Sequence, residues 1–215
     1  MFLCVSVTLC LKTMRNFEKY IEDLAEKLKQ PLPGISAQQK MSPSHRHLFQ
    51  VTQELTKAAV LILLFPENGQ PHIVLIKRTD KDEPHGGQIS LPGGRKDNAD
   101  KTLEQTAIRE CYEELGVPQE SIHIIGALTP LVIPVSHYEV FPYIGRVESK
   151  PNWQVQKEEV AYCIEIPVAD IYNPHTIKKE TKNYKGLNVE IPYFLYKNEK
   201  IWGATAMILS EFISL

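Results

Sequence analysis

The sequence predicts an α+β domain or an α/β/α sandwich, and three features of the chain lead to that prediction. Short runs rich in aliphatic and β-branched residues recur along the chain with turn signals between them, as expected for strands. Only a few segments show the spacing of an amphipathic helix, and they do not alternate with the strands as βαβ units do. The length of 215 residues suits one well-buried domain, or a domain with a helical extension.

The chain opens with an apolar run over residues 1–13. This run lacks the basic start of a signal peptide and is far shorter than a membrane span. It is therefore either a disordered segment or the product of a start assigned too early. We favour the second interpretation, with Met14 as the true start.

Residues 14–50 are predicted to form an N-terminal helix and a connector. Apolar side chains recur at helical spacing over residues 15–29, namely Phe17, Tyr20, Ile21, Leu24 and Leu28. This amphipathic helix is expected to pack on the domain or on a partner. Prolines and a glycine within residues 30–43 predict an extended connector, and residues 51–215 are expected to form the main domain.

The strands of the main domain are expected in two groups. Residues 58–65 and 73–76 flank the turn Pro66-Glu67-Asn68-Gly69, which predicts a hairpin. Later short strands are expected at residues 123–128, 140–147, 160–166 and 193–196. A helix over residues 205–213 closes the chain.

Between the two groups lies a helix with a clear signal at each end. Thr102 followed by Gln105 is a capping box, and Gly116 suits the C-cap. The side of this helix expected to face the core carries residues spaced four apart: Leu103, Ala107, Cys111 and Leu115.

The same helix places Glu110, Glu113 and Glu114 on one face, because residues three and four apart are neighbours on a helix. Carboxylates this close repel each other. A hard divalent cation such as Mg²⁺ removes the conflict and leaves sites open for water and phosphate. Arg109 is four residues from Glu113 and can pair with it. A glutamate-rich helix is usually a solvated face, but the preceding Pro92-Gly93-Gly94 turn lets the backbone approach a ligand, so we interpret the cluster as a metal site.

Residues 109–117 (RECYEELGV) resemble the second half of the Nudix hydrolase signature, with Cys111 in place of a bulky aliphatic residue. In the first half of the signature the loop is one residue longer than usual, so the expected glutamate falls on Lys101. The acidic residues of this loop are Asp97 and Asp100.

The longer loop is similar to that of the coenzyme A pyrophosphatase branch of the Nudix family. Residues 92–100 match the loop of that branch, and residues 85–92 match the end of its upstream motif. Residues 201–206 resemble a third segment typical of the branch. Arg78-Thr79 opens the upstream motif, whereas Asp82-Glu83 stands where the branch usually has leucine and arginine.

The resemblance implies a Nudix-type α/β/α sandwich with a mixed sheet, preceded by the N-terminal helical extension. It implies cleavage of a pyrophosphate linkage, with Mg²⁺ or Mn²⁺ as cofactor. Glu110 and Glu114 are then the main metal ligands, and Glu113 binds a second ion or acts as the base. Arg109 holds the carboxylates in place. An acid distant in sequence often adds a ligand or base in this family, which makes Glu159 a minority candidate beside its reading as a solvated charge.

The resemblance also implies a small-molecule nucleotide substrate, coenzyme A or a derivative, split into 3′,5′-ADP and phosphopantetheine. ADP-ribose or another nucleoside diphosphate is the alternative, and Asp82-Glu83 keeps it open. A third interpretation is a non-catalytic Nudix-fold sensor, although a sensor should have lost the metal carboxylates. The residues expected at the substrate are Arg78, His85, Gly87, Gln88 and Gly94.

Three of these candidate residues also have a simple structural interpretation. His85 is as readily a loop histidine as a phosphate contact. Arg78 is more readily a structural residue at a strand end, although its planar fork suits phosphate. Trp202 is more readily a core residue than a platform for base stacking.

Composition excludes other classes of protein. Hydrophobic residues make up 43% and charged residues 23%, as in ordinary globular domains. A net charge of −2 gives no basic excess for nucleic acid, and no membrane partner is expected. The cysteines contain no Cys-x-x-Cys pair, so no zinc site is expected, and a reduced, cytoplasmic location fits them: Cys4, Cys10, Cys111 and Cys163. A homodimer is an option that the sequence leaves open.

Overall fold

The computed structural model describes residues 16–46, 50–80, 86–184 and 186–215. The expectations for residues 1–13, for Asp82-Glu83 and for His85 lie outside these described residues.

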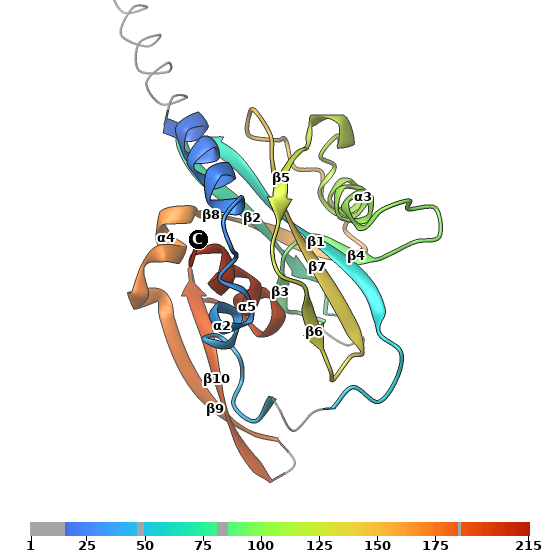
Figure 1. Cartoon of the computed structure of the whole chain (residues 1–215), viewed down its shortest axis with the longest axis vertical. Helices are drawn as coiled ribbons and strands as arrows, with labels where there is room; N and C mark the ends of the chain where they lie inside the picture. The colour runs from blue at the N-terminus through green and yellow to red at the C-terminus, as the bar shows by residue number, and fades with distance from the viewer. Residues whose placement is uncertain (1–15, 47–49, 81–85, 185) are drawn as a thin grey trace, which may run out of the picture.

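A mixed eight-stranded sheet forms the centre of the fold (Figure 1). Strand β1 (Thr56–Glu67) and strand β2 (Gln70–Arg78) form the predicted hairpin, with Leu64 opposite Ile73. Asn68 and Gly69 both have positive φ at its turn, as a tight two-residue hairpin requires. On its other side β1 runs parallel to β7 (Tyr138–Arg146), so the sheet is mixed.

The hairpin strands separate at one end, and a short segment of chain fills the fork between them. Strand β3 (Ile89–Ser90) pairs with β2, and strand β4 (Gly93–Arg95) pairs with β1. The Pro92-Gly93-Gly94 turn therefore crosses from the edge of one strand to the edge of the next. This crossing brings the glycines directly under helix α3 (Leu103–Leu115).

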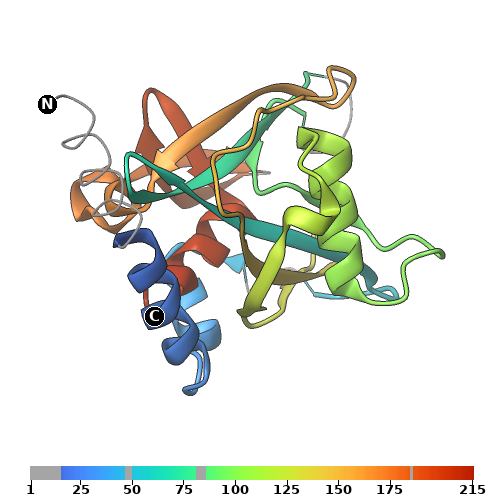
Figure 2. The same cartoon turned by 90° about the horizontal axis from the view of Figure 1, so that it is seen from above.

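Helices cover both faces of the sheet (Figures 1 and 2). Alternate residues of β1 divide the core, because neighbours along a strand point to opposite faces. On one face the side chains packed with α3 include Ala59, Leu61, Leu63, Phe65, Ala107, Cys111 and Leu115. On the other face a second cluster joins the sheet to helix α5 (Gly203–Phe212) and includes Ala58, Ile62, Leu64, Met207 and Phe212. The predicted α/β/α sandwich is confirmed.

The N-terminal helix is part of the second cluster. Residues 16–28 are helical, and Phe17, Ile21 and Leu24 are buried against the sheet. Of the two expected arrangements, packing on the domain is therefore the one observed.

The extended connector predicted for residues 30–43 is wrong in its middle, where helix α2 (Gly34–Gln39) forms. Its proline and glycine fall at the helix start, where neither costs a backbone hydrogen bond. Ala37 and Gln38 are buried, and Gln38 Nε2 donates to Glu211 Oε2 of α5 at 2.8 Å. Contacts with a distant helix thus decide the structure of this segment.

Of the remaining elements, β5 (His123–Ala127) and β8 (Val160–Pro167) lie close to their expected positions, whereas β6 (Leu131–Ile133) was not predicted. The chain also forms 3₁₀ turns at Gln119–Ser121 and Pro174–Thr176 and a short helix α4 (Val168–Tyr172). The strand predicted at residues 193–196 is the end of a longer one, β10 (Leu187–Tyr196). It forms a three-stranded sheet with β9 (Ile177–Tyr184) and β11 (Glu199–Trp202), and the β9–β10 hairpin projects from the domain in Figure 1.

Among the described helices, none combines the length and apolar character needed to cross a membrane.

Candidate active site

Helix α3 has the ends predicted for it. Thr102 Oγ1 accepts a hydrogen bond from Gln105 N at 3.2 Å, and Gln105 Oε1 accepts one from Lys101 N at 2.9 Å. Gly116 ends the helix in the left-handed region with φ of 70°. A Cβ on Gly116 would lie 2.7 Å from Gln154 Cβ, so both backbone conformation and space require glycine there.

Arg109 is the centre of an ion-pair network on this helix. Its Nε and Nη2 atoms donate to the two oxygens of Asp100 at 3.1 and 3.0 Å. Its Nη1 atom lies 2.7 Å from Glu113 Oε2 and 2.9 Å from Glu110 Oε1. The predicted pairing of Arg109 with Glu113 is therefore present, and the same guanidinium also contacts Glu110.

Asp100 is the buried anchor of this network, with 6% of its surface exposed. Its carboxylate also accepts hydrogen bonds from Thr106 Oγ1 and from Asp97 N, each at 2.9 Å. The hydrogen bonds from Arg109 lower the pKa of Asp100 to about 2. Asp100 thus pairs with the arginine, although the signature spacing puts the expected acid on Lys101. The signal available in the sequence was the one-residue longer loop, which carries Asp100 to this point.

Glu110 lies directly against Gly94. A Cβ built on Gly94 would come within 2.5 Å of the Glu110 carboxyl carbon, so only glycine leaves room for this carboxylate. Burial raises the pKa of Glu110, and the neighbouring Arg109 partly opposes that rise. Gly94, predicted to meet the substrate, is placed here against a carboxylate of α3.

Glu114 is the most buried carboxylate of the cluster, with 1% of its surface exposed. Its Oε2 atom accepts a hydrogen bond from Gly93 N at 2.9 Å, and its Oε1 atom lies 3.4 Å from Arg78 Nη1. Desolvation raises the pKa of Glu114 to about 8, because the Gly93 amide and Arg78 offset only part of the burial cost. Gly93 has φ of 151° and packs against the β1 backbone, where no side chain fits.

A fourth carboxylate reaches the cluster from a distant turn. Glu159 raises the pKa of both Glu110 and Glu114 by charge repulsion. Its turn is fixed next to β2 because Thr79 N donates to Glu159 O at 2.9 Å. The structure therefore brings the minority candidate Glu159 into the electrostatic range of the two glutamates.

The donor set fits a hard divalent cation. Glu110, Glu114 and Glu159 repel one another, and among the described residues Arg109 partly opposes the charge of Glu110 while Arg78 and the Gly93 amide partly oppose that of Glu114. Oxygen ligands of this type are those that Mg²⁺ and Mn²⁺ take. Within the described residues no three ligating side chains already converge on one point.

The segment predicted to contact substrate returns to β2 beside Arg78. Arg78 N donates to Gln88 O at 3.0 Å, and Gly87 N donates to Thr79 O at 3.2 Å. Gly87 has φ of 69°, and a Cβ there would overlap the Asp80 carboxylate. The structure therefore places Gly87 and Gln88 next to Arg78, while His85 lies outside the described residues.

Trp202 is separate from this group, on the three-stranded sheet. It is half-buried, and Lys182 Nζ lies 5.6 Å from its ring centre. It is therefore not a fully buried core residue, in contrast to the simpler of its two interpretations.

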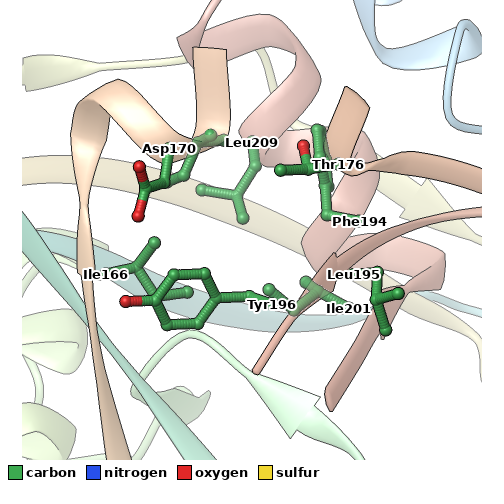
Figure 3. A pocket seen from close by; sticks show the side chains of 9 residues that line it. Ile166, Asp170, Thr176, Phe194, Leu195, Tyr196, Ile201 and Leu209 are labelled. Atoms are coloured by element: carbon green, nitrogen blue, oxygen red, sulfur yellow. The ribbon is translucent and has the colours of Figure 1, made fainter. Parts of the chain in front are cut away.

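One small pocket lies away from the carboxylates, between α4, β10 and α5 (Figure 3). Its volume is about 10 Å³, no more than a single water needs, and its surface is apolar. In Figure 3 Asp170 and Leu209 lie along one side of it, and Ile166 and Tyr196 lie along the other. This pocket is too small to hold a nucleotide.

Comparison with known proteins shows the family to which this chain belongs. Residues 55–185 match the NUDIX domain family. The chain is 33% identical over 166 residues to proteins called "Uncharacterized Nudix hydrolase NudL" from Yersinia pestis (strain Pestoides F) and Yersinia pseudotuberculosis serotype O:1b, covering 77% of this chain and 81% of each relative. A MutT protein from Methanosarcina mazei Go1 is similar in structure, with a TM-score of 0.48 and 15% identity over 77% of this chain and 96% of that one. The chain therefore belongs to the Nudix family and is a Nudix pyrophosphohydrolase.

Proposed function

We propose that this protein is a divalent-metal-dependent hydrolase that splits the pyrophosphate linkage of coenzyme A or a derivative into 3′,5′-ADP and phosphopantetheine. The observation that carries the metal-dependent part is the position of Glu114 and Glu110. Both carboxylates lie against the Gly93-Gly94 backbone beside further acids, and among the described residues the neighbouring arginines offset only part of the cost of burying them. Nudix hydrolases generally use divalent ions and act on small nucleotides, which agrees with this donor set.

In this proposal Glu110 and Glu114 hold the ion, and Arg109 orients the carboxylates around it. When bound, the ion offsets charge on the phosphates and lowers the pKa of the attacking water. Glu113 is the most exposed of the three helix carboxylates, at 46% of its side chain, and Arg109 fixes its Oε2 atom at 2.7 Å. In the proposal Glu113 accepts the proton of that water or contacts a second ion, and its exposure supports either role.

The support for coenzyme A comes from the loop that precedes α3. The one-residue longer loop is the feature shared with the coenzyme A branch. Asp100 at the end of this loop accepts hydrogen bonds from Arg109, which connects the loop to helix α3. Gly87 and Gln88, from the upstream motif of that branch, lie beside Arg78. ADP-ribose is the second candidate, because Asp82-Glu83 replaces residues that the branch usually has there.

A substrate panel tests the proposal. Coenzyme A, ADP-ribose and dinucleoside polyphosphates are incubated with the protein under Mg²⁺ and then Mn²⁺, and the products are separated. Release of 3′,5′-ADP and phosphopantetheine as the fastest reaction is expected. Faster cleavage of ADP-ribose would move the assignment to the second candidate, and no turnover of any substrate would favour a non-catalytic sensor.

The remaining features of the proposal concern the whole chain. We place the catalytic unit in residues 51–215, with residues 14–50 as an extension that completes its core. A cytoplasmic location is proposed because the described cysteines, Cys111 and Cys163, are both free thiols. Nucleic acid and membranes are not expected as partners, and size-exclusion chromatography with light scattering would decide between monomer and homodimer.

A further inference from the structure

Arg78 is the last residue of β2, and its guanidinium has one partner among the described residues. The Nη1 atom lies 3.4 Å from Glu114 Oε1, which is long for a charged hydrogen bond. The Nε and Nη2 atoms donate no hydrogen bond within the described residues, and the side chain is 30% exposed. A guanidinium has five N–H donors, so most of its donors have no partner within the described residues.

Of the two carboxylate oxygens of Glu114, one is hydrogen-bonded to the backbone and the other is available to an ion. Its Oε2 atom is held by Gly93 N at 2.9 Å. The other oxygen, Oε1, is the one next to Arg78. An ion that binds Oε1 therefore comes close to the guanidinium, and two positive charges at one carboxylate oxygen repel each other.

From this geometry we propose that Arg78 is an exchangeable partner of Glu114: its guanidinium occupies the space beside Oε1 in the metal-free protein, leaves Oε1 when a divalent ion binds, and then donates to a phosphate oxygen of the substrate. This inference rests on the metal-dependent function proposed above. The freed guanidinium suits this second role, because its planar fork bonds two phosphate oxygens at once. Metal binding and substrate binding are thereby coupled through one side chain.

The proposal makes opposite predictions for metal and for substrate. Replacing Arg78 by methionine removes the competitor at Glu114, so the protein without substrate binds Mn²⁺ more tightly, on the order of tenfold. The same variant has lost a phosphate contact, so the KM for the nucleotide rises. If Arg78 merely held Glu114 in place, the methionine variant would bind Mn²⁺ more weakly than the parent, because its Glu114 carboxylate would be misplaced.

The experiment measures Mn²⁺ binding by titration calorimetry, or by the EPR signal of free Mn²⁺, without nucleotide. It compares the parent, Arg78→Met and Arg78→Lys. The lysine variant keeps the charge but not the fork, so its Mn²⁺ affinity should stay near that of the parent while its KM rises. The matched control is Arg146→Met, since Arg146 also makes one ion pair, at 3.2 Å to Glu18, with 24% of its side chain exposed and away from the carboxylates.

Tighter Mn²⁺ binding together with a higher KM in Arg78→Met, and neither change in Arg146→Met, supports the proposal. Unchanged or weaker Mn²⁺ binding in a folded Arg78→Met overturns it while leaving the metal-dependent function intact. A parent protein that binds no Mn²⁺ overturns both. If Arg78→Met does not fold, Arg78→Lys still tests whether Arg78 binds the substrate phosphate. An unchanged KM in Arg78→Lys would show that the planar guanidinium makes no such contact.

Discussion

At the scale of single residues, two glycines and two glutamates form one unit. Gly93 supplies the amide that holds Glu114, and Gly94 supplies the empty space that Glu110 occupies. A larger residue at Gly94 would displace the Glu110 carboxylate, and one at Gly93 would clash with the β1 backbone. The acids and the Gly-Gly turn are about twenty residues apart in sequence, so their contact is a product of the fork between β1 and β2.

Glu110→Gln and Glu114→Gln are each expected to lower kcat by orders of magnitude while leaving the fold intact, because neutral amides bind hard cations poorly. Steady-state kinetics at saturating Mg²⁺ and circular dichroism are the measurements. Glu104→Gln, on an exposed position of the same helix, is the control and should keep its activity. Near-normal turnover in either site variant would remove that residue from the set of metal ligands.

Gly94→Ala is expected to lower activity by displacing Glu110, since the new methyl group would sit 2.5 Å from its carboxyl carbon. A double-mutant cycle with Glu110→Gln isolates this effect. Gly94→Ala should cost much less in kcat/KM when Glu110 is already glutamine. Equal losses in both backgrounds would mean that Gly94 acts through something other than Glu110.

The pH dependence of stability should report on Glu114. Its pKa rises from 4.5 to about 8 on folding, so between these values the folded protein binds more protons than the unfolded chain. The contribution of Glu114 to the stability of the metal-free protein is therefore greatest below pH 4.5, and it falls as pH rises toward 8. Each unit of difference between the folded and unfolded pKa corresponds to about 1.4 kcal/mol in the free energy of unfolding.

Urea unfolding in EDTA at several pH values measures this, with Glu114→Gln as the comparison. The stability of the parent relative to the variant should decrease from pH 5 to about pH 8, and Mn²⁺ should restore it at the higher pH. A difference between the two proteins that stays constant with pH would show that Glu114 does not titrate as described.

At the scale of elements, Asp100 joins the loop after β4 to helix α3. Its carboxylate holds Arg109, Thr106 and the Asp97 amide together, so the loop and the helix are one rigid piece. The carboxylates of α3 are thus oriented from outside the helix as well as from within it.

Asp100→Asn is expected to destabilise the protein by about 1.5–3 kcal/mol, because a buried, charged acceptor of several hydrogen bonds is lost. Asp97→Asn is the matched control in the same loop, since within the described residues its carboxylate accepts one hydrogen bond, from the amide of Ala99 in an exposed turn. Urea unfolding at neutral pH compares the two. The low pKa of Asp100 also means that its contribution disappears as pH falls from 3.8 toward 2, so the difference between parent and Asp100→Asn should shrink there. Equal stability of the two variants at neutral pH would contradict the anchoring role.

At the scale of the whole molecule, the N-terminal helix completes the core on the face opposite α3. Phe17, Ile21 and Leu24 are buried between the sheet and the C-terminal elements. Glu211, fully buried in α5, adds a polar link by accepting from Gly34 N, Gln38 Nε2 and Thr129 Oγ1.

A chain that begins at Met14 is expected to match the full chain in Tm and activity, whereas one that begins at residue 30 should lose most of its stability. Burial of each large apolar side chain contributes about 1.5–3 kcal/mol, and three of them amount to a large part of a typical domain's 5–15 kcal/mol. Thermal unfolding of the three chains is the measurement. A clear loss on removing residues 1–13 alone would show that this apolar run packs on the domain.

The sequence was a good guide to elements whose signals are local. The limits of α3 followed from Thr102, Gln105 and Gly116, and the first hairpin followed from the Asn68-Gly69 turn. Strand β9 gave no such signal, because its residues are mostly charged or polar and lie exposed at a sheet edge. Helix α2 was hidden for the opposite reason: its proline and glycine indicate a turn, and only burial against α5 makes it a helix.

For the site, the sequence by itself determined that three carboxylates share one face of α3, since helical periodicity needs no partner. Only the tertiary structure decided what meets them. The pairing of Asp100 with Arg109, the fit of Gly94 against Glu110, and the approach of Arg78 to Glu114 across 36 residues all depend on strands that separate and a loop that fills the gap. Local spacing specifies the direction in which a side chain leaves the helix. Segments distant in sequence decide how deeply each carboxylate is buried and which charge lies nearest to it, and burial and charge together set its pKa.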